Sequence, residues 1–191
     1  MDTKRIHTLN DIVRSLLSSA GIVMLLSACA TTTSDTGVPT PVAVWDDQKL
    51  EYQAAQEIRA SDPGFDSAHL VIVSRGGVVL LAGEVATEEL KARAGEVVNT
   101  LAPVRSVHNE LAVGGPISMV ARSNDSWLTT KVKTKLIAHG AIDSDLINVT
   151  TENGVVFLMG TVPRDQARYA VEVTQTVFGV SKIVKVFEYT D

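Results

Sequence analysis

The sequence has a single cysteine, Cys29, among its 191 residues. An intramolecular disulfide is therefore excluded. No apolar run reaches the about 20 residues that a membrane-spanning helix requires. Basic residues are also scarce, with 17 Lys and Arg against 22 Asp and Glu, and a net negative chain is a poor binder of nucleic acid. Aromatic residues are only 5% of the chain, but the hydrophobic fraction of 45% is typical of compact globular domains.

The beginning of the chain is organised as an export signal. A short basic leader precedes residues 15–28, which are almost all apolar or small and end directly before Cys29. The closing Leu-Ser-Ala-Cys resembles the lipobox of bacterial lipoproteins, which predicts a signal peptide at residues 1–28 and acylation of Cys29. The alternatives are an ordinary small residue near a cleavage site or a thiol that pairs between chains. Ala30, in place of an aspartate after the cysteine, points by the same resemblance to the outer membrane.

The segment after the cysteine has little to bury. Residues 30–44 are rich in Thr and contain two prolines, so residues 29–44 are predicted to be a lipidated cysteine and a flexible tether. Such a chain has a mean span of roughly 20 Å. The folded part is thus expected to stay close to the membrane.

The remainder of the chain is a tandem duplication. Residues 77–85 (GVVLLAGEV) align with residues 154–162 (GVVFLMGTV), and alternating hydrophobic residues match on both sides of them. Val104, Val107 and Leu111, for example, match Val180, Ile183 and Phe187. Two small modules are therefore predicted, a first domain at 45–113 and a second at 124–191, with a linker at 114–123. They are expected to be separable, although domains this small can also share one core.

Each copy has the pattern helix, strand, strand, helix, strand. The first helices are predicted at residues 46–60 and 125–139, each with an acidic or Asn residue placed to cap it. A hairpin follows, and Asn153-Gly154 between hydrophobic runs is typical of a type I′ turn. The expected fold is α+β, with two tandem αββαβ modules, each a three-stranded mixed sheet with two helices on one face.

These features resemble the BON domain. The resemblance rests on the paired helix and hairpin, the Gly-Val-Val-x-Leu-x-Gly-x-Val stretch and the closing strand, and it covers residues 45–191. Residues 149–160 are its most specific part, and the first copy is the looser match. Two such domains behind a lipobox are similar to dual-BON outer-membrane lipoproteins. The resemblance implies a lipid-anchored protein on the periplasmic face of the outer membrane that binds anionic phospholipid and supports envelope integrity, without enzyme activity.

The residues carry no catalytic or metal-binding motif. His69, His108 and His139 lie in different elements, without a cysteine or a close carboxylate pattern. No catalytic residue, metal or cofactor is predicted. The histidines are interpreted as surface or half-buried residues.

The two copies differ in charge. Residues 44–113 contain six basic and eleven acidic residues, whereas residues 124–191 contain seven and eight. Only the second copy can approach an anionic surface at low electrostatic cost. Its first helix adds Lys131, Lys133 and Lys135 after a single early Asp125.

One stripe of that helix is the predicted phospholipid-binding site. Trp127, Lys131 and Lys135 follow at four-residue steps beside the face of Leu128, Val132 and Leu136 that is expected to pack on the sheet. Leu128 is included in the predicted site together with Trp127, Lys131 and Lys135. A tryptophan aligned with lysines is typical of helices that rest on lipid. The alternative places Trp127 in the core. A competing functional hypothesis is a periplasmic adaptor that binds envelope proteins, with Trp127 as the anchor and no direct lipid recognition.

Replacing Cys29 tests the lipid anchor. The variant Cys29→Ser is expected to leave membranes, because it cannot be acylated and the other membrane contacts are weak. Cell fractionation measures the outcome. Equal membrane binding of variant and parent would exclude the lipoprotein hypothesis.

Overall fold

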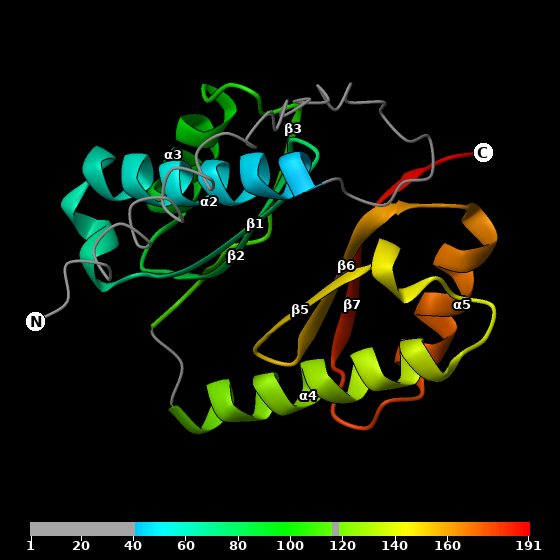
Figure 1. Cartoon of the computed structure of the whole chain (residues 1–191). Helices are drawn as coiled ribbons and strands as arrows, with labels where there is room; N and C mark the ends of the chain where they lie inside the picture. Colours follow the sequence, from blue (N-terminus) through cyan, green and yellow to red (C-terminus); the bar gives the residue numbers. More distant parts are fainter. Residues whose placement is uncertain (1–40, 116–118) are drawn as a thin grey trace, which may run out of the picture. The chain divides into compact units, whose positions relative to one another are not determined.

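Two mixed β-sheets carry the two repeats, and each has its helices on one face (Figure 1). The computed structural model describes residues 41–115 and 119–191, all of which belong to one compact unit. The first repeat contains α2 (Pro41–Ser61), η1 (Pro63–Ser67), β1 (His69–Arg75), β2 (Val78–Val85), α3 (Glu88–Asn99), β3 (Ser106–Asn109) and β4 (Ala112–Val113). The second contains α4 (Met119–Ala138), η2 (Ser144–Leu146), β5 (Asn148–Glu152), β6 (Val155–Val162), α5 (Arg164–Gln175) and β7 (Lys182–Tyr189). The predicted signal peptide and Cys29 lie outside the described residues.

The predicted α+β fold is confirmed. In the second repeat β6 is the central strand, antiparallel to β5 and parallel to β7, and in the first repeat β2 pairs in the same way with β1 and β3. The first sheet differs from the expected three strands, because its last strand is split into β3 and β4, both parallel to β2. The interruption between β3 and β4 comes directly after Asn109. The side-chain amide of Asn109 donates a hydrogen bond to the Lys91 carbonyl, and its Oδ1 atom accepts one from the Leu111 N–H.

Both first helices begin earlier than predicted. Helix α2 includes residues 41–44 of the expected tether, and α4 includes residues 119–123 of the expected linker. Proline is tolerated in a first helical turn, so Pro41 does not prevent α2 from starting there. Asp125 is consequently not a helix cap. It lies inside α4 and is 5% exposed.

Asp125 instead holds the hairpin turn of its own repeat. Its two carboxylate oxygens accept the N–H groups of Asn153 and Gly154, both at 2.8 Å. These turn residues have positive φ, 49° and 75°, as expected for the Asn-Gly turn. In the first repeat Asp47 has the same role, because its carboxylate accepts a hydrogen bond from the Gly76 N–H at 3.0 Å. The same contact between helix and hairpin therefore occurs twice.

Each repeat has a hydrophobic core under its helices, and a third cluster joins the two repeats. The core of the first repeat forms between α2, α3 and the sheet, and that of the second between α4, α5 and the sheet. The opposite faces of the sheets contribute to one shared cluster, made of Val78, Leu80, Ala82, Phe157, Met159 and Val186. Separability of the modules stays a prediction, and this cluster is the apolar surface that separation would expose.

Removing the Asp125 carboxylate is expected to destabilise the protein. Asp125→Ala leaves two amides of the hairpin turn without their partner, and hydrogen bonds to charged groups contribute about 1.5–3 kcal/mol each. We expect a loss of about 3 kcal/mol in the free energy of unfolding, measured by urea denaturation. Asp66→Ala, at an exposed position, is the control and should change stability by less than about 0.5 kcal/mol. Equal stability of both variants would contradict this role for Asp125.

Candidate functional site

The outer face of α4 presents a tryptophan beside two lysines. The Trp127 side chain is 57% exposed, which excludes its placement in the core of this structure. The Lys131 ammonium lies 3.5 Å from the centroid of the Trp127 ring. A cation over an aromatic face is attracted by the ring quadrupole, so this contact orients the indole along the helix surface.

The loop between α5 and β7 packs next to this stripe. Lys135 Nζ donates to Thr176 Oγ1 at 2.8 Å, and Lys131 Nζ lies 3.5 Å from the Phe178 carbonyl oxygen. These contacts fix the loop to α4 and leave Phe178 90% exposed. We define the α4 patch as Trp127, Phe178, Lys131 and Lys135. The oxygens that these two lysines contact belong to neutral groups and not to carboxylates.

Phe178 was not predicted from the sequence. It follows Val177, which is buried, and precedes Gly179, whose φ is +105°. Adjacency to a buried residue does not by itself predict exposure, because Leu146 and Ile147 are also adjacent and both lie in the core of the second repeat. The sequence therefore offered no clear signal for Phe178.

Leu128 does not contact solvent, contrary to its place among the predicted phospholipid-binding residues. Its side chain is 1% exposed and packs in the core of the second repeat with Val132 and Leu136. The inward face of α4 therefore begins one position after Trp127. Leu128 holds the helix against the sheet and does not form part of the exposed surface.

The first repeat has no equivalent of the α4 patch. The pairing of β2 with β3 and of β6 with β7 sets Val107 opposite Val79 and Ile183 opposite Val156, which confirms the alignment of the copies. The first helices align through their buried residues, Leu50 with Leu128, Ala54 with Val132 and Ile58 with Leu136. This places Lys49, Gln53 and Glu57 at the positions of Trp127, Lys131 and Lys135, and the strand alignment places Ala102 at the position of Phe178. Duplication thus conferred the same scaffold, and the surfaces then diverged.

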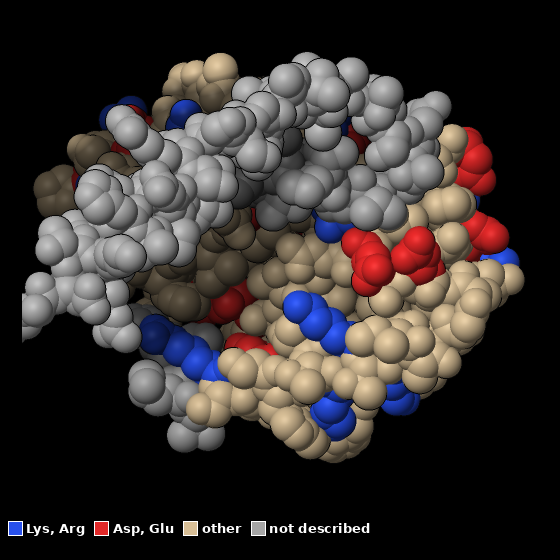
Figure 2. Space-filling model, in the orientation of Figure 1, with Lys and Arg blue, Asp and Glu red and all other residues tan. Residues whose placement is uncertain are grey.

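Charge on the surface follows this difference. Figure 2 shows Lys and Arg side chains along the lower edge, where α4 lies in Figure 1. Lys133, which is not part of the α4 patch, is another exposed lysine of this helix. The surface of α4 is therefore the part of the second repeat best suited to anionic ligands.

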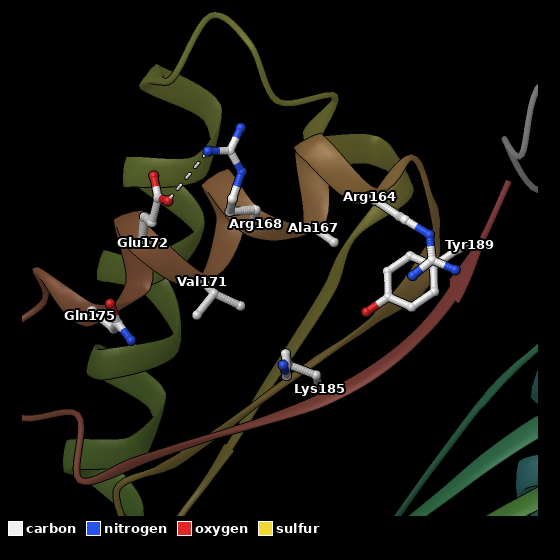
Figure 3. A pocket seen from close by; sticks show the side chains of 8 residues that line it. All are labelled: Arg164, Ala167, Arg168, Val171, Glu172, Gln175, Lys185 and Tyr189. Carbon is white, nitrogen blue, oxygen red and sulfur yellow. Dashed lines mark ion pairs between the residues drawn. The ribbon is translucent and has the colours of Figure 1, made fainter. Parts of the chain in front are cut away.

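A second basic surface lies between α5 and β7, in a groove of about 420 Å³ (Figure 3). Arg164, Arg168 and Lys185 line it, together with Tyr189. Arg168 forms an ion pair of 4.0 Å with Glu172, drawn as a dashed line in Figure 3. The Arg164 guanidinium lies 4.3 Å from the Tyr189 ring centroid, and its Nε donates to the Asp191 carbonyl. Arg168 is paired with a carboxylate, whereas Lys131 and Lys135 contact neutral oxygens, so the groove is a weaker candidate than the α4 patch.

No helix within residues 41–115 and 119–191 is long and apolar enough to cross a bilayer.

Comparison with known proteins assigns the fold to a family. The BON domain family matches residues 46–115 and residues 124–191. This chain belongs to the BON-domain family. Both BON matches fall on the repeats described above, one on each sheet and its helices.

Two relatives of this BON protein cover most of its length. It is 36% identical over 146 residues to the outer membrane lipoprotein DolP of Haemophilus influenzae, which covers 76% of each chain. It is 35% identical over 144 residues to a 21 kDa hemolysin of Actinobacillus pleuropneumoniae, covering 75% of this chain and 74% of that protein. Among solved structures, CdsD of the Chlamydia trachomatis type III secretion system aligns with 16% identity and a TM-score of 0.30, over 74% of this chain and 62% of that chain.

The exposure of Trp127 can be tested through stability. Trp127→Glu is expected to keep the fold and to cost no more than about 1 kcal/mol, because it removes an exposed ring and one cation–π contact. Leu128→Glu is the matched control one position along the same helix. It should unfold the second repeat, since burying an unpaired carboxylate costs several kcal/mol. Thermal unfolding followed by circular dichroism measures both, and comparable damage by the two substitutions would place Trp127 in the core.

Proposed function

We propose that this BON protein is an outer-membrane lipoprotein, held on the periplasmic face through Cys29, whose α4 patch contacts anionic phospholipid. The observation that carries the proposal is the exposure of Trp127 and Phe178 on either side of two lysines. The similarity to an outer membrane lipoprotein supports the location. The role in envelope integrity that the family resemblance implies belongs to the same proposal.

The chemistry of the patch suits the boundary between headgroups and acyl chains. Indole and phenyl rings are stabilised at that depth, because the apolar ring leaves water while the indole N–H can still donate a hydrogen bond. The ammonium groups of Lys131 and Lys135 then lie at the level of the lipid phosphates.

The strength of each contact decides how the protein works. A lysine near an anionic membrane contributes about 1 kcal/mol, so two lysines contribute less than the about 4 kcal/mol of a millimolar complex. The patch alone therefore binds weakly. Anchoring through Cys29 makes the second contact intramolecular, at an effective concentration of roughly millimolar. Contact by the patch then depends on how much anionic lipid lies nearby.

Net charge sets the orientation on the membrane. The chain after the signal peptide has a net charge of −6, counted from the sequence, and most of the acidic excess belongs to the first repeat. An anionic surface repels that repeat and attracts α4. The protein is thus expected to rest on its second repeat.

Vesicle binding by charge-reversed variants tests the proposal. With the unlipidated mature chain, Trp127→Glu and Phe178→Glu should abolish sedimentation with vesicles that contain phosphatidylglycerol. Lys131→Glu and Lys135→Glu should each weaken binding about tenfold or more, since reversing a charge that contributes about 1 kcal/mol changes binding by about twice that amount. The effect of the lysine variants should shrink as salt is raised.

Tyr52→Glu is the control in the first repeat, because Tyr52 is also an exposed aromatic residue on a first helix. It should leave vesicle binding unchanged. Folded α4 variants that bind anionic vesicles as well as the parent would rule out α4 as the lipid surface. The periplasmic adaptor, which binds an envelope protein through the same aromatic residues, would then be the favoured function.

A further inference from the structure

A cluster of three potential metal ligands lies at the junction of the two repeats. His69 begins β1, Glu84 lies near the end of β2, and Glu152 ends β5. One donor atom from each residue lies within 4.8 Å of the other two, and His69 Nε2 is 3.2 Å from Glu152 Oε2. Two ligands thus come from the first repeat and one from the second.

Glu84 is the informative member of the cluster. It is 6% exposed, and its Oε2 atom is buried without a hydrogen-bond partner. Leaving a buried carboxylate oxygen unsatisfied costs free energy. Burial raises the pKa of Glu84, and the charges of His69 and Arg122 oppose that rise. Burial also raises the pKa of Glu152.

The surrounding charges leave the cluster negative. Asp125 is close enough to raise the pKa of both carboxyl groups, and Arg122 is the cation whose charge acts on Glu84. The Oε2 atom of Glu84 and the Nε atom of Arg122 are both buried without a hydrogen-bond partner among the described residues, so these two atoms do not satisfy each other. Three carboxylates, those of Glu84, Glu152 and Asp125, therefore face two basic groups, His69 and Arg122. The acidic groups exceed the basic ones, and a divalent cation would offset the excess.

The cluster is accessible from two cavities. One, of about 430 Å³, is lined by His69, Glu152 and Asp125 among others, and the second, of about 260 Å³, is lined by Glu84 and Glu152. Glu152 borders both. Each of the three residues therefore borders at least one cavity.

From this geometry we infer that His69, Glu84 and Glu152 form a binding site for a divalent transition metal, with Zn²⁺ as the best match. One imidazole and two carboxylates are a donor set that Zn²⁺ accepts, with a water as the fourth ligand. Ligand atoms around tetrahedral Zn²⁺ are about 3.4 Å apart, given bonds of about 2.1 Å. The His69–Glu152 separation of 3.2 Å is close to that spacing, and the donor atom of Glu84, which lies within 4.8 Å of the other two, would have to move closer on binding. A bound ion would join the two repeats.

Zinc titration of the mature chain tests the site. The protein carries Cys29→Ser, so that the thiol does not bind zinc, and is stripped of metal with a chelator. Isothermal titration calorimetry should show one Zn²⁺ per chain with a Kd in the micromolar range or below, and weaker binding of Ca²⁺. Zinc should also raise the Tm by several degrees, because an ion that binds only the folded state stabilises it.

Isosteric variants separate a ligand role from a structural one. Glu84→Gln and Glu152→Gln should each weaken zinc binding at least tenfold and lose the zinc-dependent rise in Tm, while their metal-free Tm stays at or above that of the parent. His69→Gln should also lose binding. The matched controls His108→Gln, on β3, and Glu57→Gln, on the exposed face of α2, should bind zinc like the parent.

Arg122 distinguishes the metal site from a simple ion-pair network. Removing its charge in Arg122→Gln should tighten zinc binding, because the guanidinium repels the ion. The inference is overturned if the parent shows no stoichiometric binding at zinc concentrations of about 100 micromolar. It is also overturned if the glutamine variants bind zinc as well as the parent, or if Arg122→Gln weakens binding. Should one glutamine variant fail to fold, the other one and His69→Gln decide the same question.

Discussion

The central strands β2 and β6 have no polar face. All eight residues of β2 are buried, and β6 is buried over most of its length. Main-chain pairing covers both edges of each strand, so the two faces are what the rest of the fold must protect from water. Helices cover one face, and the shared cluster around Leu80, Phe157 and Met159 covers the other. The arrangement of the repeats follows from this requirement.

That constraint decides which surfaces remain free. The inner face of α4 packs on the sheet through Leu128, Val132 and Leu136. Only the outer face of this helix is therefore available to a ligand. The loop after α5 then rests on the same helix through Lys131 and Lys135. A patch with two aromatic rings and two ammonium groups results. The copies keep the buried residues that build the module and differ in those that reach solvent.

The junction between the two repeats carries mainly acidic groups, in contrast to the basic α4 patch. Packing of the sheets brings His69 of the first repeat to Glu152 of the second, and Arg105 to Glu188 at 2.7 Å. The ion pair with Glu188 raises the pKa of Arg105 and is half exposed, so it contributes little to stability. The buried carboxylates beside His69 are more costly. The chain thus has cationic groups on the face of α4 and anionic groups at the junction, which we propose as two separate sites for ligands of different charge.

The sequence alone determined the duplication, the order of elements in each repeat, the Asn-Gly turn and the stripe of Trp127, Lys131 and Lys135, because periodicity and turn chemistry are local properties of the chain. Prediction from the sequence failed where one residue type can have two different structural roles. An aspartate such as Asp125 accepts amide hydrogens at a helix start or at a hairpin turn, and only the fold showed which. Phe178 and the cluster of His69, Glu84 and Glu152 depend on segments far apart in the chain. The cluster was brought together by the burial of two apolar sheet faces against each other, and the loop of Phe178 was placed beside α4 by Val177 in the core of the second repeat. No local pattern records either contact.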